Sequence, residues 1–271
     1  MKRTILRALL SIVSAFAMTV GACYAQESAY DQVLKRGKLI AGIKFDYPPF
    51  SSMDSSGHLS GFEVDIGNYI GRKMGVPVEF KQVTSSTRIP SLLAGAIDLT
   101  LTHMNPTRER AKVIDFGMVY FKGGTSILVK KNSGIKSIKD LEAPKLTATT
   151  QGSSDGPFFL AFQPKGKLVY FQEHPQAVLA LKQGKVNAVT TEVLTLQQFA
   201  KNDPELEVIE PPYKPDPAAI GLRQNDSKWR LFLDQTIMEM WKDGEYQRAH
   251  EKNLGVPVAF TIELWPDFYE K

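Results

Sequence analysis

The sequence predicts an α/β protein whose sheets are largely parallel. Short apolar runs rich in β-branched residues, such as KLIAGIKF (38–45) and LTATT (146–150), alternate with segments of helical periodicity. This alternation is typical of strands connected by helices. The clearest helix is 228–243, whose apolar residues recur at the spacing of one buried helix face. A length of 271 residues with 43% hydrophobic residues allows one large or two small domains.

The first 25 residues have the features of a bacterial export signal. Basic residues near the start precede an apolar run over 8–20, and CYA (23–25) fits a cleavage site between small residues. The apolar run is too short for an ordinary transmembrane helix. The lone cysteine offers an alternative, because VGAC (20–23) fits a lipobox that would leave Cys23 lipidated. We expect cleavage after Ala25 and an exported protein.

Composition argues against several kinds of partner. Without the three basic residues of the signal, the net charge falls from +4 to about +1. A near-neutral protein gives no reason to expect binding to nucleic acid or to an anionic membrane. The single cysteine excludes an internal disulfide, and none of the four histidines stands at metal-ligand spacing. We therefore expect no metal and no cofactor.

In the first half of the chain, the strand at 38–45 leads to Tyr47-Pro48-Pro49. An aromatic ring held at a strand end can roof a ligand or simply plug the core. The segments that follow are a helix over 61–75, a strand over 76–83, the turn TSSTRIP (84–90) and a short helix over 91–94.

The stretch DLTLTHMNPTRERAKVIDF (98–116) carries the most specific chemistry. A strand over 99–102 is predicted to break at 103–106, and Thr107 then caps a short helix that contains Arg110. Free backbone N–H groups at a helix start attract anions, and a guanidinium group matches a carboxylate. The stretch therefore predicts a carboxylate seat at the C-terminal end of a strand. A helix cap followed by a surface charge is the alternative.

Two segments of the second half can also bind charged groups. QGSS (151–154) is a turn between a strand and a helix, and its N–H groups and hydroxyls suit an anion. Glu192 follows the strand 187–191, where it can pair with an ammonium group or stabilise a helix start. The other predicted strands are 126–131, 167–172, 206–210 and 218–223, the last entered through the stiff segment PPYKPDP (211–217), and the other predicted helices are 137–141, 157–162, 175–183 and 245–253.

Several of these motifs resemble those of the periplasmic polar-amino-acid binding proteins of ABC importers, the solute-binding family 3. They are YPPF followed by GFEVDI, TSSTRIP, NPTRERAKVIDF and QGSS. The resemblance covers nearly the whole mature chain and implies a two-lobed periplasmic binding protein of type II. Each lobe would be a sheet flanked by helices, and two crossover segments would join the lobes. The implied boundaries are 1–25 for the signal peptide, 26–122 plus 218–271 for lobe 1, including the aromatic tail 254–271, and 123–217 for lobe 2.

The resemblance also assigns residues to a ligand site between the lobes. Arg110 and the turn at Asn105 would bind the carboxylate of an amino acid. Thr102 or the carbonyl of His103, with Glu192, would hold the ammonium group. Tyr47 is a candidate roof, Arg88 would recognise the ligand side chain, and from lobe 2 Ser154, with Ser153 in a secondary position, would contact the carboxylate. The alternative for Arg88 is a solvent-exposed or inter-lobe arginine.

Three positions depart from the pattern of the family. Ser85 stands where many relatives have an apolar or aromatic residue, His103 where they have a small one, and Glu192 where they usually have Asp. His103 can contact the ligand side chain or fill space. Together with Arg88, it favours glutamate, aspartate or their amides as the ligand.

The function implied by the resemblance is transport. A monomeric periplasmic protein would capture an L-amino acid of the acidic or amide type and deliver it to an ABC transporter permease in the membrane, without being an enzyme. One alternative is an enzyme like the periplasmic cyclohexadienyl dehydratases on the same scaffold, with Glu192 as the acidic group. Another is a ligand-sensing partner of a receptor.

Overall fold

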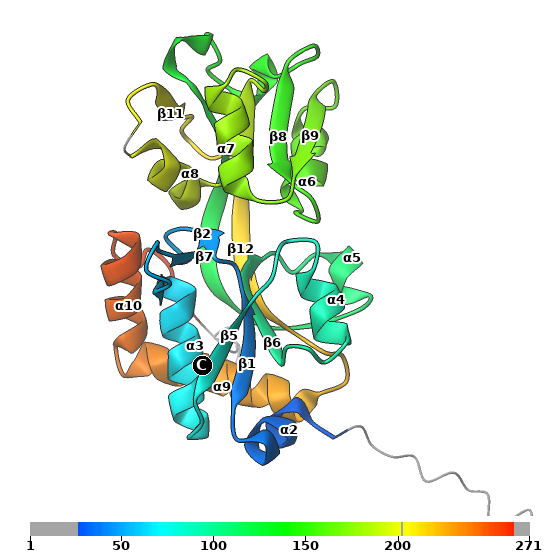
Figure 1. The fold of residues 1–271 in the computed structure, drawn as a ribbon, viewed down its shortest axis with the longest axis vertical. Coiled ribbons are helices and arrows are strands. Elements are labelled where there is room, and N and C mark those ends of the chain that lie inside the picture. Colours follow the sequence, from blue (N-terminus) through cyan, green and yellow to red (C-terminus); the bar gives the residue numbers. More distant parts are fainter. Residues whose placement is uncertain (1–26, 202, 263–271) are drawn as a thin grey trace, which may run out of the picture.

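The computed structural model describes residues 27–201 and 203–262 of the chain. The predicted signal peptide, including Cys23, and the last residues of the aromatic tail lie outside the described residues. Figure 1 shows two lobes joined by two long strands, β7 (Asp115–Lys130) and β12 (Lys214–Leu222). The predicted two-lobed α/β architecture with two crossovers is thus confirmed. The exact division of the chain into lobes stays a prediction, and its proposed boundaries, 122/123 and 217/218, fall inside these two strands.

One continuous path of hydrogen-bonded strands runs through both lobes, in the order β5-β1-β6-β12-β7-β10-β8-β9, and β11 also pairs with β7. The outer strands of each lobe are parallel, as predicted, whereas β7 and β12 are antiparallel to their neighbours and to each other. The strands besides β7 and β12 are β1 Leu39–Ile43, β5 Val78–Gln82, β6 Leu99–Met104, β8 Leu146–Thr150, β9 Lys167–Phe171, β10 Ala188–Glu192 and β11 Leu206–Val208, and a small separate sheet holds β2 Asp46–Tyr47, β3 Ser51–Met53 and β4 Leu59–Ser60.

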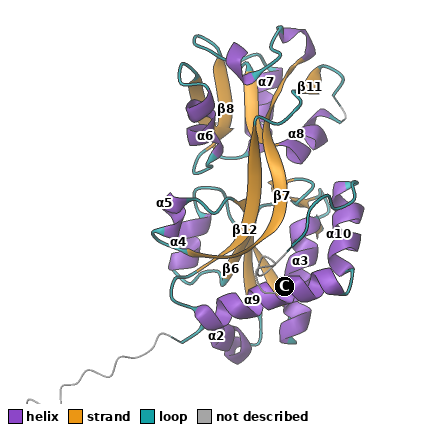
Figure 2. Cartoon of the chain, turned by 180° about the vertical axis from the view of Figure 1, so that it is seen from behind, coloured by secondary structure: helices purple, strands orange, loops and turns teal. Residues whose placement is uncertain are grey.

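Helices cover the sheet in both lobes (Figures 1 and 2). They are α2 Ala29–Arg36, α3 Phe62–Met74, α4 Arg88–Leu93, α5 Arg108–Ala111, α9 Ser227–Lys242 and α10 Glu245–Leu254 in the first lobe, and α6 Asp155–Phe162, α7 His174–Lys182 and α8 Val193–Ala200 in the second, with short 3₁₀ turns at Lys131–Ser133 and Ile138–Asp140. Neither α2 nor α8 was predicted from the sequence. Ser28 caps α2 by accepting a hydrogen bond from the Tyr30 amide, which is a local signal that the sequence contains.

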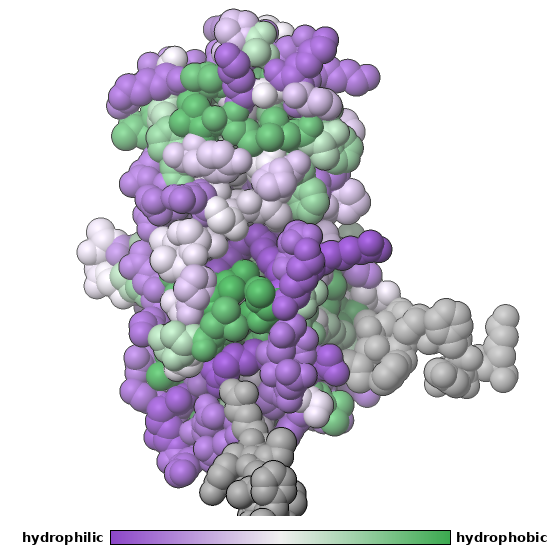
Figure 3. Space-filling model, turned by 90° about the vertical axis from the view of Figure 1, so that its right-hand side faces the viewer, coloured by the Kyte–Doolittle hydropathy of each residue, from purple (hydrophilic) through white to green (hydrophobic). Residues whose placement is uncertain are grey.

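Each lobe has its own hydrophobic core. In the first, the predicted stripe of α9 is buried, and Trp229 also donates its indole N–H to the Asp98 carbonyl at 3.1 Å. Phe260, in the described part of the tail, packs against the same core, as expected. In the second lobe, Val189 of β10 and Leu181 of α7 belong to a separate buried cluster. Figure 3 shows hydrophobic residues gathered on each lobe, with more polar residues at the level between them.

Three predicted boundaries are wrong, and they concern β6, β12 and β7, which are consecutive strands in the middle of the sheet. β6 continues through His103 and ends at Met104, which pairs with Ala219 of β12. β12 begins at Lys214, inside the proline-rich segment that the sequence suggested was a separate return. The predicted strand 126–131 is the end of β7, which is 16 residues long. Pairing with distant strands fixes these lengths, and local sequence does not carry that information.

Within residues 27–201 and 203–262, no helix combines the length and the apolar character needed to cross a membrane.

Candidate functional site

The two lobes touch through side chains that the sequence analysis placed at the site. The hydroxyl of Tyr47 lies 2.9 Å from Thr191 Oγ1 of the second lobe. Ser154 donates its hydroxyl to Asn105 Oδ1 at 2.6 Å. Residues far apart in sequence therefore meet where the two lobes contact each other.

Arg110 lies at the centre of the predicted carboxylate seat. Its backbone N–H donates to Thr107 Oγ1, so Thr107 caps α5 as predicted. Its guanidinium group donates to the carbonyl of Asn105 at 2.9 Å and, across the lobe boundary, to the carbonyl of Gly152 at 3.1 Å. No carboxylate of the described residues pairs with it. Burial lowers the pKa of Arg110, while Asp155 and Asp216 act in the opposite direction. A guanidinium group bound only to carbonyls is suited to receive an anion.

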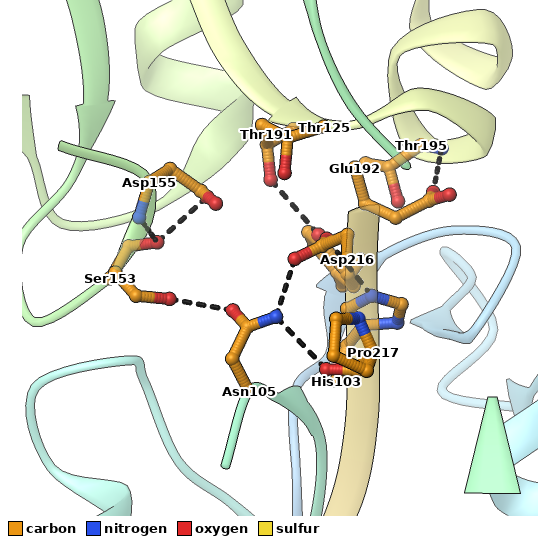
Figure 4. A network of polar contacts seen from close by, with 12 residues as sticks. His103, Asn105, Thr125, Ser153, Asp155, Thr191, Glu192, Thr195, Asp216 and Pro217 are labelled. Atoms are coloured by element: carbon orange, nitrogen blue, oxygen red, sulfur yellow. Dashed lines mark hydrogen bonds and ion pairs between the residues drawn. The ribbon is translucent and has the colours of Figure 1, made fainter. Parts of the chain in front are cut away.

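A polar network fixes Asn105 beside this seat (Figure 4). Asn105 Nδ2 donates to Asp216 Oδ1 at 2.5 Å and to the Pro217 carbonyl at 2.9 Å. Asp216 also contacts His103 Nε2 at 3.2 Å and Lys214 Nζ at 3.4 Å. Burial alone would raise the pKa of the Asp216 carboxyl, but His103 and Lys214 hold it well below its usual range. Asp216 thus stays ionised and orients the amide of Asn105 toward Ser154.

His103 belongs to the same network. Its ring packs 4.4 Å from the Phe50 ring, measured between centroids, and its backbone N–H donates to Glu63 Oε1 at 2.5 Å. Its φ of +45° is rare for a residue with a side chain, and the carboxylate of Glu63 holds the backbone in this conformation. Although burial alone would lower the pKa of His103, Asp216 raises it. The imidazole is therefore engaged with Asp216 through Nε2, which leaves only Nδ1 for any contact with a ligand.

Glu192 ends β10 and begins α8. Its Oε2 accepts a hydrogen bond from the Thr195 amide at 3.0 Å, so the carboxylate does cap a helix (Figure 4). Its Oε1 is buried and has no hydrogen-bond partner among the residues that the structure describes. Burial raises the pKa of Glu192 to about 8, even though His103 and the Thr195 amide lower it. One oxygen is thus structural, and the other is available to a ligand.

Arg88 is the first residue of α4, and it is only 2% exposed, so the solvent-exposed alternative is wrong. Its Nη1 donates to the Thr102 carbonyl at 2.9 Å and to Thr102 Oγ1 at 3.2 Å. Its Nε is buried and lacks a partner within the described part of the chain. Burial lowers the pKa of Arg88 to about 9, and Arg110 adds to the effect. Both the carbonyl and the hydroxyl of Thr102, which was predicted to hold the ammonium group of the ligand, therefore accept hydrogen bonds from Arg88.

The two remaining predicted residues face different neighbours. The Tyr47 ring stacks on Phe50 at 5.7 Å between centroids and approaches the His174 ring at 4.9 Å. Tyr47 is 3% exposed, and with its hydroxyl on Thr191 it fills the space between the lobes. Ser153 donates its hydroxyl to Asp155 Oδ2 at 2.7 Å, so its hydroxyl points to this acid.

The structure adds three charged residues that sequence reasoning overlooked. Lys44 follows β1, Asp155 follows the QGSS turn and begins α6, and Asp216 lies within the proline-rich segment. All three are 5% exposed or less. Lys44 lies just before YPPF, Asp155 follows QGSS directly, and Asp216 lies inside PPYKPDP. A charged residue in or next to one of these segments was the available sequence signal. Among the described residues no cluster of three or more His, Cys, Asp or Glu could hold a metal ion.

Comparison with known proteins gives a consistent result. Residues 39–256 match the family described as bacterial extracellular solute-binding proteins, family 3. The glutamine-binding protein of Geobacillus stearothermophilus is 37% identical over 216 residues, or 78% of this chain and 82% of that protein. An ancestral arginine-binding protein bound to arginine is 34% identical with a TM-score of 0.76, covering 80% of this chain and 98% of its own. The ancestral amino-acid-binding protein AncCDT-1, a precursor of cyclohexadienyl dehydratase, is 31% identical with a TM-score of 0.79, covering 84% and 100%.

Proposed function

The chain belongs to the bacterial extracellular solute-binding proteins of family 3, and we propose that it captures an L-amino acid of the acidic or amide type between its lobes and delivers it to the permease of an ABC transporter. We further propose that residues 1–25 direct export to the periplasm, that the lobes divide at 122/123 and 217/218, and that the protein acts as a monomer. The named relatives above are binding proteins, which supports a transport role rather than catalysis.

The observation that carries the proposal is the position of Arg110. Its guanidinium group reaches both lobes through two carbonyl groups and has no carboxylate partner among the described residues. An amino-acid carboxylate bound there would also meet the hydroxyl of Ser154 and the turn at Asn105, while the free Oε1 of Glu192 would receive the ammonium group. Because these groups come from both lobes, the ligand would stabilise the closed form by its differential affinity.

The test is a thermal-shift screen of the mature protein against the twenty amino acids. A ligand at about 100 times its dissociation constant adds about 2.7 kcal/mol of stability, which is a readily measured shift. Arg110→Ala should then weaken the best ligand by roughly 2–5 kcal/mol, since it leaves a buried carboxylate without its charge partner. Arg108→Ala is the matched control, because Arg108 lies in the same helix but is exposed. Unchanged affinity in Arg110→Ala would contradict the proposed site.

A second function is favoured by one observation. The pKa of Glu192 is raised to about 8, so this carboxyl can carry a proton at neutral pH, as a general acid must. AncCDT-1, described as a precursor of cyclohexadienyl dehydratase, is a structural relative. The competing function is therefore elimination of water and carbon dioxide from a prephenate-like substrate. Release of phenylpyruvate from prephenate or arogenate would establish it, and its absence, together with an amino-acid hit in the screen, would favour transport. If the ligand-bound protein contacted a receptor and not a permease, the same binding event would serve ligand sensing.

A further inference from the structure

Two buried cations at the junction of the lobes lack a carboxylate partner. Lys44 is 5% exposed and Arg88 is 2% exposed. Within the described ranges no carboxylate oxygen lies within 4.0 Å of either charged group. The ammonium group of Lys44 instead lies 4.0 Å from the centroid of the Tyr47 ring, and Arg88 donates to Thr102. Buried charges are normally paired, because an uncompensated one is expensive to desolvate.

Three acids lie near Lys44, namely Asp46, Glu63 and Asp155, but none of them forms an ion pair with it. Glu63 Oε1 accepts hydrogen bonds from the His103 amide and from the hydroxyl of Tyr120. Glu63 Oε2 and Asp46 Oδ2 are buried and have no hydrogen-bond partner among the described residues, so neither oxygen contacts the ammonium group of Lys44. Asp155, which reaches the junction from the second lobe, accepts the hydroxyl of Ser153. Asp46, Asp155 and Glu63 all lie close enough to raise the pKa of Lys44 electrostatically. The protein therefore supplies only distant negative charge to the two cations.

Lys44 and Arg88 are different groups from those proposed to bind the α-carboxylate and the α-ammonium group of the ligand. Arg110 and Ser154 serve the carboxylate, and Glu192 serves the ammonium group, in the function proposed above. Lys44 adjoins Tyr47, whose hydroxyl contacts Thr191 of the second lobe. Arg88 extends along the end of β6 to Thr102. A side chain reaching from the main-chain seat into the junction would meet both cations.

We propose that Lys44, acting with Arg88, binds the anionic side chain of a dicarboxylic amino acid and makes the protein select the acid over its amide. This inference rests on the proposed function. A ligand carboxylate would give the two cations the partner that the protein lacks. An amide of the same shape would leave both unpaired, because its carbonyl can accept hydrogen bonds but brings no charge. Lys44 is then the specificity-determining residue. Arg88 alone does not bind the side-chain carboxylate strongly enough, because its Nη1 already donates hydrogen bonds to Thr102.

The protonation of Lys44 gives the selectivity a pH dependence. Burial and then Arg88 lower the pKa of the Lys44 ammonium to about 8, while Asp46, Asp155 and Glu63 raise it. The preference for the acid should therefore decline as pH rises above about 8, whereas binding of the amide should change less. The titratable and charged groups that act on Lys44 from the elements around it are Asp46, Glu63, Arg88, Asp155, Glu173 and His174.

The experiment is calorimetric titration with two matched pairs, L-glutamate with L-glutamine and L-aspartate with L-asparagine. The wild type should bind the acid of at least one pair about tenfold or more tightly than its amide at pH 7. Lys44→Met should weaken the acid by about tenfold to a hundredfold and leave the amide within about threefold, so that the preference disappears. Lys44→Arg should retain the preference. Lys81→Met, at an exposed lysine of the same lobe, is the matched control and should behave as wild type.

Four outcomes would overturn the inference. One is a wild type that binds the amide as tightly as the acid. Another is a Lys44→Met variant that loses both ligands equally, which would indicate a general structural role. A third is tight binding of a different amino acid with neither acid preferred. This result would keep the proposed role in amino-acid transport but reject the proposed acidic or amide ligand. No response to any of the twenty amino acids from folded protein would reject the proposed function and this inference together.

Discussion

Replacing Glu192 by Gln should stabilise the ligand-free protein at pH 8 while removing its ability to bind a ligand ammonium group. Glu192 is 0% exposed, and burial raises its pKa from 4.5 to about 8. A raised carboxyl pKa means that the folded protein holds a proton which the unfolded chain has released. The associated stability is fully present below pH 4.5 and is lost as the pH rises to about 8. At about 1.36 kcal/mol per pH unit, the loss between pH 5 and 8 amounts to at most about 4 kcal/mol.

Glutamine suits this test because its carbonyl oxygen can still accept the Thr195 amide that Glu192 Oε2 now binds. The free energy of unfolding should be measured by urea denaturation at pH 5 and pH 8, without ligand. The wild type should lose stability between these values relative to Glu192→Gln, and Glu251→Gln, at an exposed position, should follow the wild type. Identical pH dependence in wild type and Glu192→Gln would refute the buried-carboxyl argument.

Two further substitutions separate lobe closure from folding. Gly152 has φ +79°, and a Cβ there would lie 2.7 Å from the Ser85 carbonyl oxygen of the other lobe, so Gly152→Ala should weaken ligand binding about tenfold or more by opposing closure. Gly134→Ala is its control, because φ is +74° there as well but no atom lies near the added Cβ. Equal ligand affinity of the two variants in calorimetric titration would show that the clash at Gly152 does not oppose lobe closure. Trp229→Ala should destabilise the first lobe by about 3–5 kcal/mol in thermal or urea unfolding. Its ligand affinity below the melting transition should stay near wild type, and a large loss would mean that the core and the site are coupled.

Local sequence patterns predicted the elements that local interactions determine. The stripe of the helix at 228–243 and the cap at Thr107 depend on residues a few positions apart, and both are present. The motif residues Arg110, Asn105 and Ser154 were also found from sequence, and the structure brings them together. Whether they bind a ligand stays a prediction.

What sequence could not provide is the pairing of distant segments. His103 and Asp216 are 113 positions apart, so nothing in the sequence around the histidine indicates that its Nε2 is engaged. The proline-rich segment suggests a loop, yet Lys214–Leu222 forms a strand because β7 and β6 flank it. The helix α8 was missed because its short, largely apolar sequence gives no clear helical face.

The distribution of charge suggests why closure would depend on a ligand. Lys44, Arg88 and Arg110 lie on the first lobe and lack carboxylate partners among the described residues, while the second lobe contributes Glu192, with its free Oε1, and Asp155. Closing the lobes removes these groups from water without pairing them, and this opposes closure. A zwitterionic ligand with a second carboxylate would reverse that penalty, since its carboxylates would meet the cations and its ammonium group would meet the carboxyl of Glu192. Because the ligand would gain these contacts only when the lobes are closed, its differential affinity for the closed form would be large. The buried ionisable groups that make the ligand-free closed state unfavourable would then be the same ones that make the bound state selective.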